Sequence, residues 1–160
     1  MNTGVARERP VPRSEGVRRF LQRMPTRDTT PEMQLRRELH RRGIRFRLTA
    51  SGLPCRPDLV LTRARICVFV HGCFWHGCER HAVAPKNNAS FWATKMDANR
   101  ARDARNIRDL EALGWETVIV WEHEAPEAAA DRVELAWRRR TGRSGRTAET
   151  PPPSSRSSSR

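Results

Sequence analysis

The sequence lacks any apolar run close to the roughly 20 residues that span a bilayer, so we expect no membrane-crossing helix and no membrane partner. The Arg-rich beginning is not followed by the apolar stretch of a secretory signal, which favours a cytoplasmic protein. Cysteine is scarce, with four residues, and two of them, Cys73 and Cys78, lie close to histidines. In a cytoplasmic chain such a cluster predicts metal ligands rather than disulfides.

Positive charge is abundant and concentrated at the two ends. The formal net charge is +13, of which residues 1–27 carry +5 and residues 138–160 carry +6, leaving +2 for the residues between. Each Lys or Arg placed near a phosphate releases counterions, so this distribution favours a polyanionic partner, a nucleic acid. The alternative is that the basic ends only keep a small protein in solution.

The order of predicted elements indicates a single α/β domain with a three-layer, mixed sheet. Residues 1–16 form a flexible basic arm, residues 17–140 the folded domain, and residues 141–160 a disordered tail rich in Pro, Ser and Arg. Periodicity, caps and breakers predict helices over 17–24, 29–42, 90–113 and 126–139, and strands over 44–48, 58–61, 66–70 and 117–121.

Two faces of the long predicted helix differ in character. Apolar residues recur at every third position, and we expect them to face the core: Ala98, Ala101, Ala104, Ile107, Leu110 and Leu113. A polar stripe of Asn99, Asp103 and Asn106 lies on a neighbouring face. Trp115 and Trp121, in strand context, are assigned to the core, as is Cys67.

A zinc site is predicted from four soft or borderline ligands. Cys73, Cys78 and His81 fall within nine residues, and His123 at the end of the last strand could complete a tetrahedron. A closed set of four leaves no open position for chemistry, so the role would be structural: pinning the loop over residues 71–87. The alternative is two unpaired cysteines and two surface histidines.

Acids and imidazoles left over from that site suggest metal-assisted phosphodiester hydrolysis. Asp58 opens a buried strand and could hold a hard divalent cation such as Mg²⁺, with Glu32 as a second carboxylate. His71 and His76 could be ligands or acid/base groups, and they are free for chemistry if the other four residues bind zinc. Asp103 could orient one of these imidazoles.

Large aromatic residues sit beside these groups. Phe74 and Trp75 lie inside the predicted metal loop, and Trp92 begins the long helix. Apolar side chains on a rigid loop can wedge between base pairs, and unstacking costs least where pairing is already poor. On composition alone, core packing explains these three residues equally well.

Several motifs, in the same order and over about residues 17–137, resemble the very-short-patch-repair (Vsr) DNA mismatch endonucleases. They are Arg56-Pro57-Asp58, Val70-His71-Gly72-Cys73-Phe74-Trp75-His76-Gly77-Cys78, Phe91-Trp92, Leu113-Gly114-Trp115 and Val120-Trp121-Glu122, with Arg27-Asp28-Thr29 and Glu32 upstream. The chain departs from the family pattern in having His at position 123, often Cys, and Val at position 70, where some members have Thr.

The resemblance implies a fold like that of type II restriction endonucleases and Mg²⁺-dependent nicking of one strand, 5′ to the T of T:G mismatches formed when 5-methylcytosine deaminates. It implies Asp58 and the backbone of Val70 as Mg²⁺ ligands, and the zinc site as above. It assigns His71, His76 and Asp103 to catalysis, Glu32 to a supporting role, and Phe74, Trp75 and Trp92 to intercalation. A monomer acting on duplex DNA at the bacterial nucleoid is expected, with mismatch-repair proteins as candidate partners.

Two other functions remain open at this point. A restriction-type endonuclease would cut both strands of matched DNA at a recognition sequence. A zinc-stabilised DNA-binding module without activity would not need Asp58 or the spare histidines.

Overall fold

The structure is a computed structural model that describes residues 19, 27–81 and 88–142. Its elements follow the order α2 (Thr30–Arg41), β1 (Leu59–Leu61), β2 (Ile66–His71), α3 (Ala89–Ala112), β3 (Glu116–Trp121) and α4 (Pro126–Thr141). These elements form a small α/β fold. The predicted arm over 1–16, nearly all of the helix predicted over 17–24, and the tail beyond residue 142 lie outside the described residues.

The three strands form a mixed sheet, as predicted, and their order in it is β1-β2-β3. β1 and β2 pair as an antiparallel hairpin, whereas β2 and β3 are parallel and are connected through α3. In the parallel pair His71 is the register partner of Trp121, so both strands end at the same edge of the sheet. The loop that follows β2 and the residues that follow β3 therefore leave the sheet side by side.

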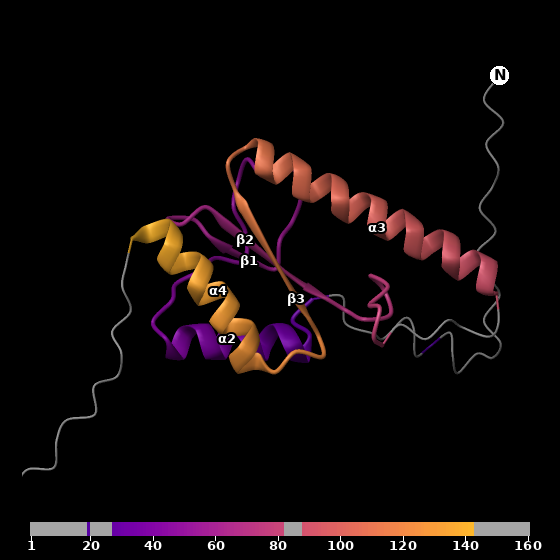
Figure 1. Cartoon of the computed structure of the whole chain (residues 1–160), viewed down its shortest axis with the longest axis horizontal. Coiled ribbons are helices and arrows are strands. Elements are labelled where there is room, and N and C mark those ends of the chain that lie inside the picture. The colour runs from indigo at the N-terminus through magenta and orange to yellow at the C-terminus, as the bar shows by residue number, and fades with distance from the viewer. Residues whose placement is uncertain (1–18, 20–26, 82–87, 143–160) are drawn as a thin grey trace, which may run out of the picture.

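Helices cover both faces of the sheet (Figure 1). Because side chains alternate along a strand, one face of the sheet carries Leu59, Leu61, Ile66, Val68, Val118 and Val120. This face packs on α2 and α4, through residues such as Leu39 and Val133. On the opposite face Val60, Cys67 and Leu110 of α3 are fully buried, and Trp115 packs against them. The predictions for Cys67 and Trp115 are confirmed.

The predicted strand over residues 44–48 is wrong in extent. The segment makes one isolated bridge to β1, in which Arg47 and Val60 exchange both backbone hydrogen bonds at 2.8 Å. Ile44 is fully buried and Leu48 is 39% exposed, so the segment leaves the core toward its end. Because β1 is only three residues long, it cannot form a longer ladder of hydrogen bonds with this segment.

The face of α3 expected to meet the core is also wrong. Of its apolar positions only Leu110 is buried, and Leu113, just beyond the helix, is 47% exposed. A three-residue repeat drifts by about 60° per step around a helix of 3.6 residues per turn, so it cannot stay on one face. The stripe that faces the rest of the protein is polar and includes Asn99 and Asp103, both half-buried. Figure 1 shows why: α3 touches the sheet near its end and extends away from it at its beginning.

None of the described helices is both long and apolar enough to cross a membrane.

Candidate metal centre and catalytic cluster

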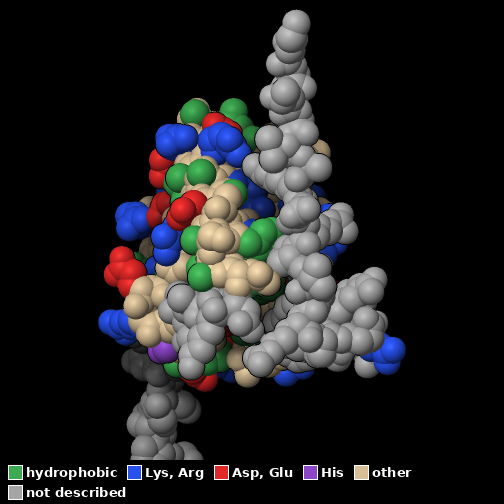
Figure 2. Space-filling view, turned by 90° about the vertical axis from the view of Figure 1, so that its right-hand side faces the viewer, with side chains coloured by type: hydrophobic (Ala, Val, Ile, Leu, Met, Phe, Trp, Pro, Cys, Tyr) green, Lys and Arg blue, Asp and Glu red, His purple; other side chains and the backbone are tan. Residues whose placement is uncertain are grey.

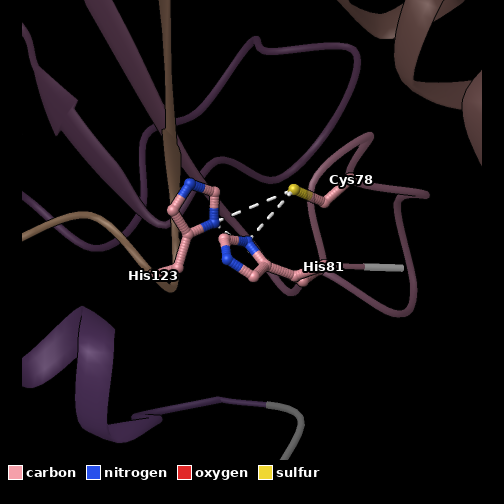
Figure 3. Close-up of side chains that lie close together, drawn as sticks. Cys78, His81 and His123 are labelled. Atoms are coloured by element: carbon pink, nitrogen blue, oxygen red, sulfur yellow. Dashed lines mark hydrogen bonds between the residues drawn. The ribbon is translucent and has the colours of Figure 1, made fainter. Parts of the chain in front are cut away.

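The four predicted zinc ligands converge where β2 and β3 end. Cys73 and Cys78 are buried in the loop after β2, His81 follows them, and His123 lies two residues beyond β3. One donor atom from each lies within 4.8 Å of all the others. Figure 3 shows the rings of His81 and His123 turned toward the sulfur of Cys78, with both Nδ1 atoms 3.8 Å from it. Cys73 Sγ lies 3.0 Å from His123 Nδ1.

This geometry fits a tetrahedral zinc ion. Zinc bonds of about 2.0–2.3 Å place tetrahedral ligand atoms roughly 3.3–3.8 Å apart, close to the distances found. Two sulfurs and two imidazole nitrogens are a donor set that zinc prefers. Because the four protein groups fill the tetrahedron, such a site has no open position, and its effect would be to tie the loop over residues 72–81 (the zinc loop) to the end of β3.

The two thiols also need a positive charge between them. Burial, and then the neighbouring Cys78, raise the pKa of Cys73 above its ordinary value. Burial opposes ionisation of Cys78 as well, but the amide N–H groups of Arg80 and His81 lower the pKa of that thiol. Backbone amides that favour ionisation of one thiol beside a second cysteine form an arrangement that suits a divalent cation.

His71, His76 and Asp103 form a second cluster next to the zinc loop, here called the histidine cluster. His71 ends β2, His76 lies in the zinc loop, and Asp103 comes from the polar stripe of α3. The two imidazole rings stack with centroids 3.8 Å apart, and His76 Nδ1 lies 2.6 Å from Asp103 Oδ2. A carboxylate at Nδ1 fixes the tautomer and leaves Nε2 free, as in other imidazoles that transfer protons.

The environment of His71 keeps it neutral. Its side chain is only 7% exposed, and burial, assisted by the charge of His76, lowers its pKa to about 4. The edge of Trp121 packs against its ring at a centroid distance of 5.4 Å. Trp121 was assigned to the core, but it is half-buried and contacts this imidazole instead. The reason is that parallel pairing makes it the register partner of His71, which the sequence does not reveal.

Asp58 and Val70 are brought together by the β1–β2 hairpin. The Val70 amide donates a 2.7 Å hydrogen bond to Asp58 Oδ2. Burial raises the pKa of Asp58 above its ordinary value; this hydrogen bond opposes the rise and the charge of Glu32 adds to it. A half-buried carboxylate with a raised pKa gains from a nearby cation, so Asp58 with the Val70 backbone suits a hard divalent ion such as Mg²⁺.

Glu32 lies close enough to Asp58 to influence it, but its own oxygens are occupied. It is 5% exposed and accepts hydrogen bonds from the Asp28 amide, the Thr29 hydroxyl and the Arg36 guanidinium. The first two tie the residues that precede α2 to its first turn. Glu32 and Asp58 line one cavity of about 130 Å³, so the structure brings together all five residues predicted to be catalytic around the end of β2.

The three predicted intercalating residues lie in one half-exposed group, here called the aromatic cluster. Phe74, Trp75 and Trp92 meet with ring centroids 5.1–5.8 Å apart. The Asn99 side chain donates a 2.9 Å hydrogen bond to the Trp75 carbonyl, which ties the zinc loop to α3. On the face seen in Figure 2, hydrophobic side chains reach the surface among basic, acidic and uncharged ones.

Comparison with known proteins agrees with this arrangement. A family described as DNA mismatch endonuclease Vsr matches residues 13–82. The type II nicking enzyme V.XorIIP of Xanthomonas oryzae pv. oryzae is 44% identical over 123 residues, covering 76% of this chain and 90% of the relative. The type II nicking enzyme V.NmeAIP of Neisseria meningitidis is 37% identical, covering 69% and 79%. The DNA mismatch endonuclease Vsr of Escherichia coli K12 is 43% identical, covering 61% and 63%.

A carboxylate, two imidazoles and a loop whose side chains could hold a metal ion lie at one sheet edge, and with these relatives they define a DNA endonuclease. The chain belongs to the Vsr family of DNA mismatch endonucleases, and the nicking enzymes above align with it over most of their own length.

Proposed function

We propose that the protein nicks one strand of duplex DNA, 5′ to the T of a T:G mismatch produced by deamination of 5-methylcytosine, in a Mg²⁺-dependent reaction. The observation that carries the proposal is the convergence of Asp58, the histidine cluster and a half-exposed aromatic cluster around the end of β2. A DNA-binding module without activity has no need for a His76–Asp103 pair and the half-buried Asp58.

In the proposed mechanism Asp58 and the backbone of Val70 would hold a Mg²⁺ ion. The chemistry that such an ion would supply is Lewis-acid stabilisation of the negative charge on the scissile phosphate and on the leaving oxygen. Asp103 holds the proton on His76 Nδ1, so His76 Nε2 accepts the proton of the attacking water. His71, kept neutral by burial, supports the stacked His76 ring without adding a competing positive charge. Glu32 acts by holding Arg36 near this centre.

In the same proposal Cys73, Cys78, His81 and His123 bind a structural zinc ion, which fixes the zinc loop and the residues it carries. Phe74, Trp75 and Trp92 enter the base stack at the mismatch. Opening the stack costs a few kcal/mol, least at a poorly paired site, so the wedge favours a mismatch over matched DNA.

The wider assignment follows the family. Residues 17–140 form the endonuclease domain, with a fold like that of type II restriction endonucleases, between a basic arm and a basic tail. The protein works as a monomer, because a single-strand nick at an asymmetric mismatch needs one active site. It acts at the bacterial nucleoid alongside mismatch-repair proteins.

The deciding experiment is nicking of otherwise identical T:G and T:A duplexes, with Mg²⁺ and with EDTA. We expect a nick in the T strand of the T:G duplex only, and only with Mg²⁺. Replacing Trp75 with Ala should lower the T:G to T:A rate ratio more than it lowers metal content. Equal cleavage of both duplexes, or cleavage of both strands, would instead support a restriction-type enzyme.

A further inference from the structure

Basic side chains outnumber acidic ones in the lining of the cavity beside Asp58. Its lining includes Arg27, Arg36 and Arg56, but only two acids, Glu32 and Asp58. Arg36 is neutralised, since it lies 2.9 Å from Glu32 and 2.5 Å from Asp28. Within the described part of the chain, neither Arg27 nor Arg56 lies within ion-pair distance of an acid, and both are exposed. Two guanidinium groups are therefore available at the mouth of the cavity.

Pro57 fixes Arg56 relative to Asp58. Pro57 is buried, its ring restricts its own backbone, and it holds the preceding Arg56 in an extended conformation. Both neighbours of Pro57 line the same cavity. The restricted backbone keeps the origin of the Arg56 side chain close to Asp58.

The chemistry of this cavity suits a singly charged phosphodiester. A guanidinium donates two parallel N–H groups to two oxygens of one phosphate, which an ammonium cannot do. The Asp58 carboxylate on the opposite side would repel a phosphate unless a cation intervenes, so the group that binds here must approach the bound metal and the arginines together.

We propose, building on the nuclease function above, that Arg56, assisted by Arg27, binds the nonbridging oxygens of the scissile phosphodiester and holds it against Asp58. Arg56 is then a catalytic residue rather than one of the many basic groups that attract DNA. Its contribution grows as negative charge develops on the phosphate in the transition state.

The first test compares Arg56→Ala with Arg63→Ala. Both arginines are exposed and flank β1, but Arg63 lies in the hairpin turn at the end away from Asp58, so the variants lose the same charge at different places. In single-turnover nicking at saturating enzyme, Arg56→Ala should be roughly 10²-fold slower, the loss typical of one transition-state donor, and Arg63→Ala close to wild type. Arg56→Lys should be intermediate. Duplex affinity in EDTA should fall by similar, small factors in both alanine variants.

The second test asks whether Arg56 touches the scissile phosphate itself. A phosphorothioate of either configuration is placed at the cleavage position or at the next phosphate. Wild type should be slowed by sulfur in one configuration at the cleavage position, and Arg56→Ala should lose most of that discrimination. A change only at the neighbouring phosphate would overturn the assignment.

An unaltered single-turnover rate in Arg56→Ala would also overturn the proposal. So would a slower rate that is matched by an equal loss of affinity for the duplex. These outcomes differ from failure of the proposed function, in which wild type itself does not nick the T:G duplex. Thermal melting of each variant confirms that it is folded.

Discussion

At the scale of single residues, the site depends on contacts that join distant positions. His76 and Asp103 are 27 positions apart, yet their side chains meet at 2.6 Å because the zinc loop folds back on α3. Asp58 and Val70 are joined in the same way across the hairpin at 2.7 Å. Each contact restricts a group whose chemistry requires a defined direction: the ring nitrogen that takes a proton, or the oxygen that faces a cation.

Replacing Asp103 with Asn should slow nicking strongly while leaving the fold intact. An amide can hold the His76 ring in the wrong tautomer, and such a change costs up to about 10⁴-fold in other carboxylate–imidazole pairs, so we expect a loss of roughly 10²-fold or more. Single-turnover nicking of the T:G duplex measures it. The matched control is Asp97→Asn on the same helix, whose side chain is 74% exposed and pairs only loosely with Arg100. Equal effects of the two variants would contradict an orienting role.

At the scale of elements, α2 and α4 are joined by Arg42, the residue that caps the end of α2. Arg42 is 13% exposed and donates to Glu38 on its own helix and to Asp131 and Glu134 on α4. Hydrogen bonds from Arg41 and then from Arg42 lower the pKa of Glu38 to about 2, so this carboxylate is charged at neutral pH. The two helices also share the apolar cluster that includes Leu39 and Val133.

Replacing Arg42 with Ala should lower the free energy of unfolding by about 1–3 kcal/mol. The variant loses several charge-assisted hydrogen bonds and leaves Asp131 on α4 without its partner, whereas Glu134 keeps its ion pair with Arg138. Urea denaturation measures the change. Arg41→Ala is the matched control, because Arg41 is 69% exposed and its ion pair among the described residues is with Glu38 on the same helix, so its loss should change the stability little. A similar cost for both variants would show that the link to α4 contributes little.

At the scale of the whole molecule, one edge of the sheet supports every proposed function. The parallel pairing of β2 and β3 brings the zinc loop and His123 together, and the same loop carries His76 and two residues of the aromatic cluster. α3 then closes over the loop, with Asp103 at His76 and Asn99 at the Trp75 carbonyl. Losing the zinc site should therefore disturb catalysis and base intercalation together.

Chelating the metal, or replacing Cys73 with Ser, should release about one zinc per chain, lower the melting temperature and abolish nicking. The loop has little apolar content to hold it, so metal binding supplies its folding free energy. Atomic absorption, thermal melting and the T:G assay measure the three effects. Cys55→Ser is the control for loss of a thiol. Cys55 packs against the cluster of Val60, Cys67 and Leu110 and is not one of the four candidate ligands. Unchanged melting of Cys73→Ser would rule out a structural site.

The sequence by itself determined the order of most elements, the buried strands and the residue types at the site, because alternation, caps and ligand spacing are local signals. It could not determine which face of α3 is buried, since the apolar repeat of that helix is out of step with its turn, nor that Trp121 would contact His71. Nor could it show that Arg56 and Asp58 share a cavity with Arg27 and Glu32. Those features depend on strand register and on how helices pack across the sheet, which only the tertiary structure decided, because each is set by contacts between residues far apart in the chain.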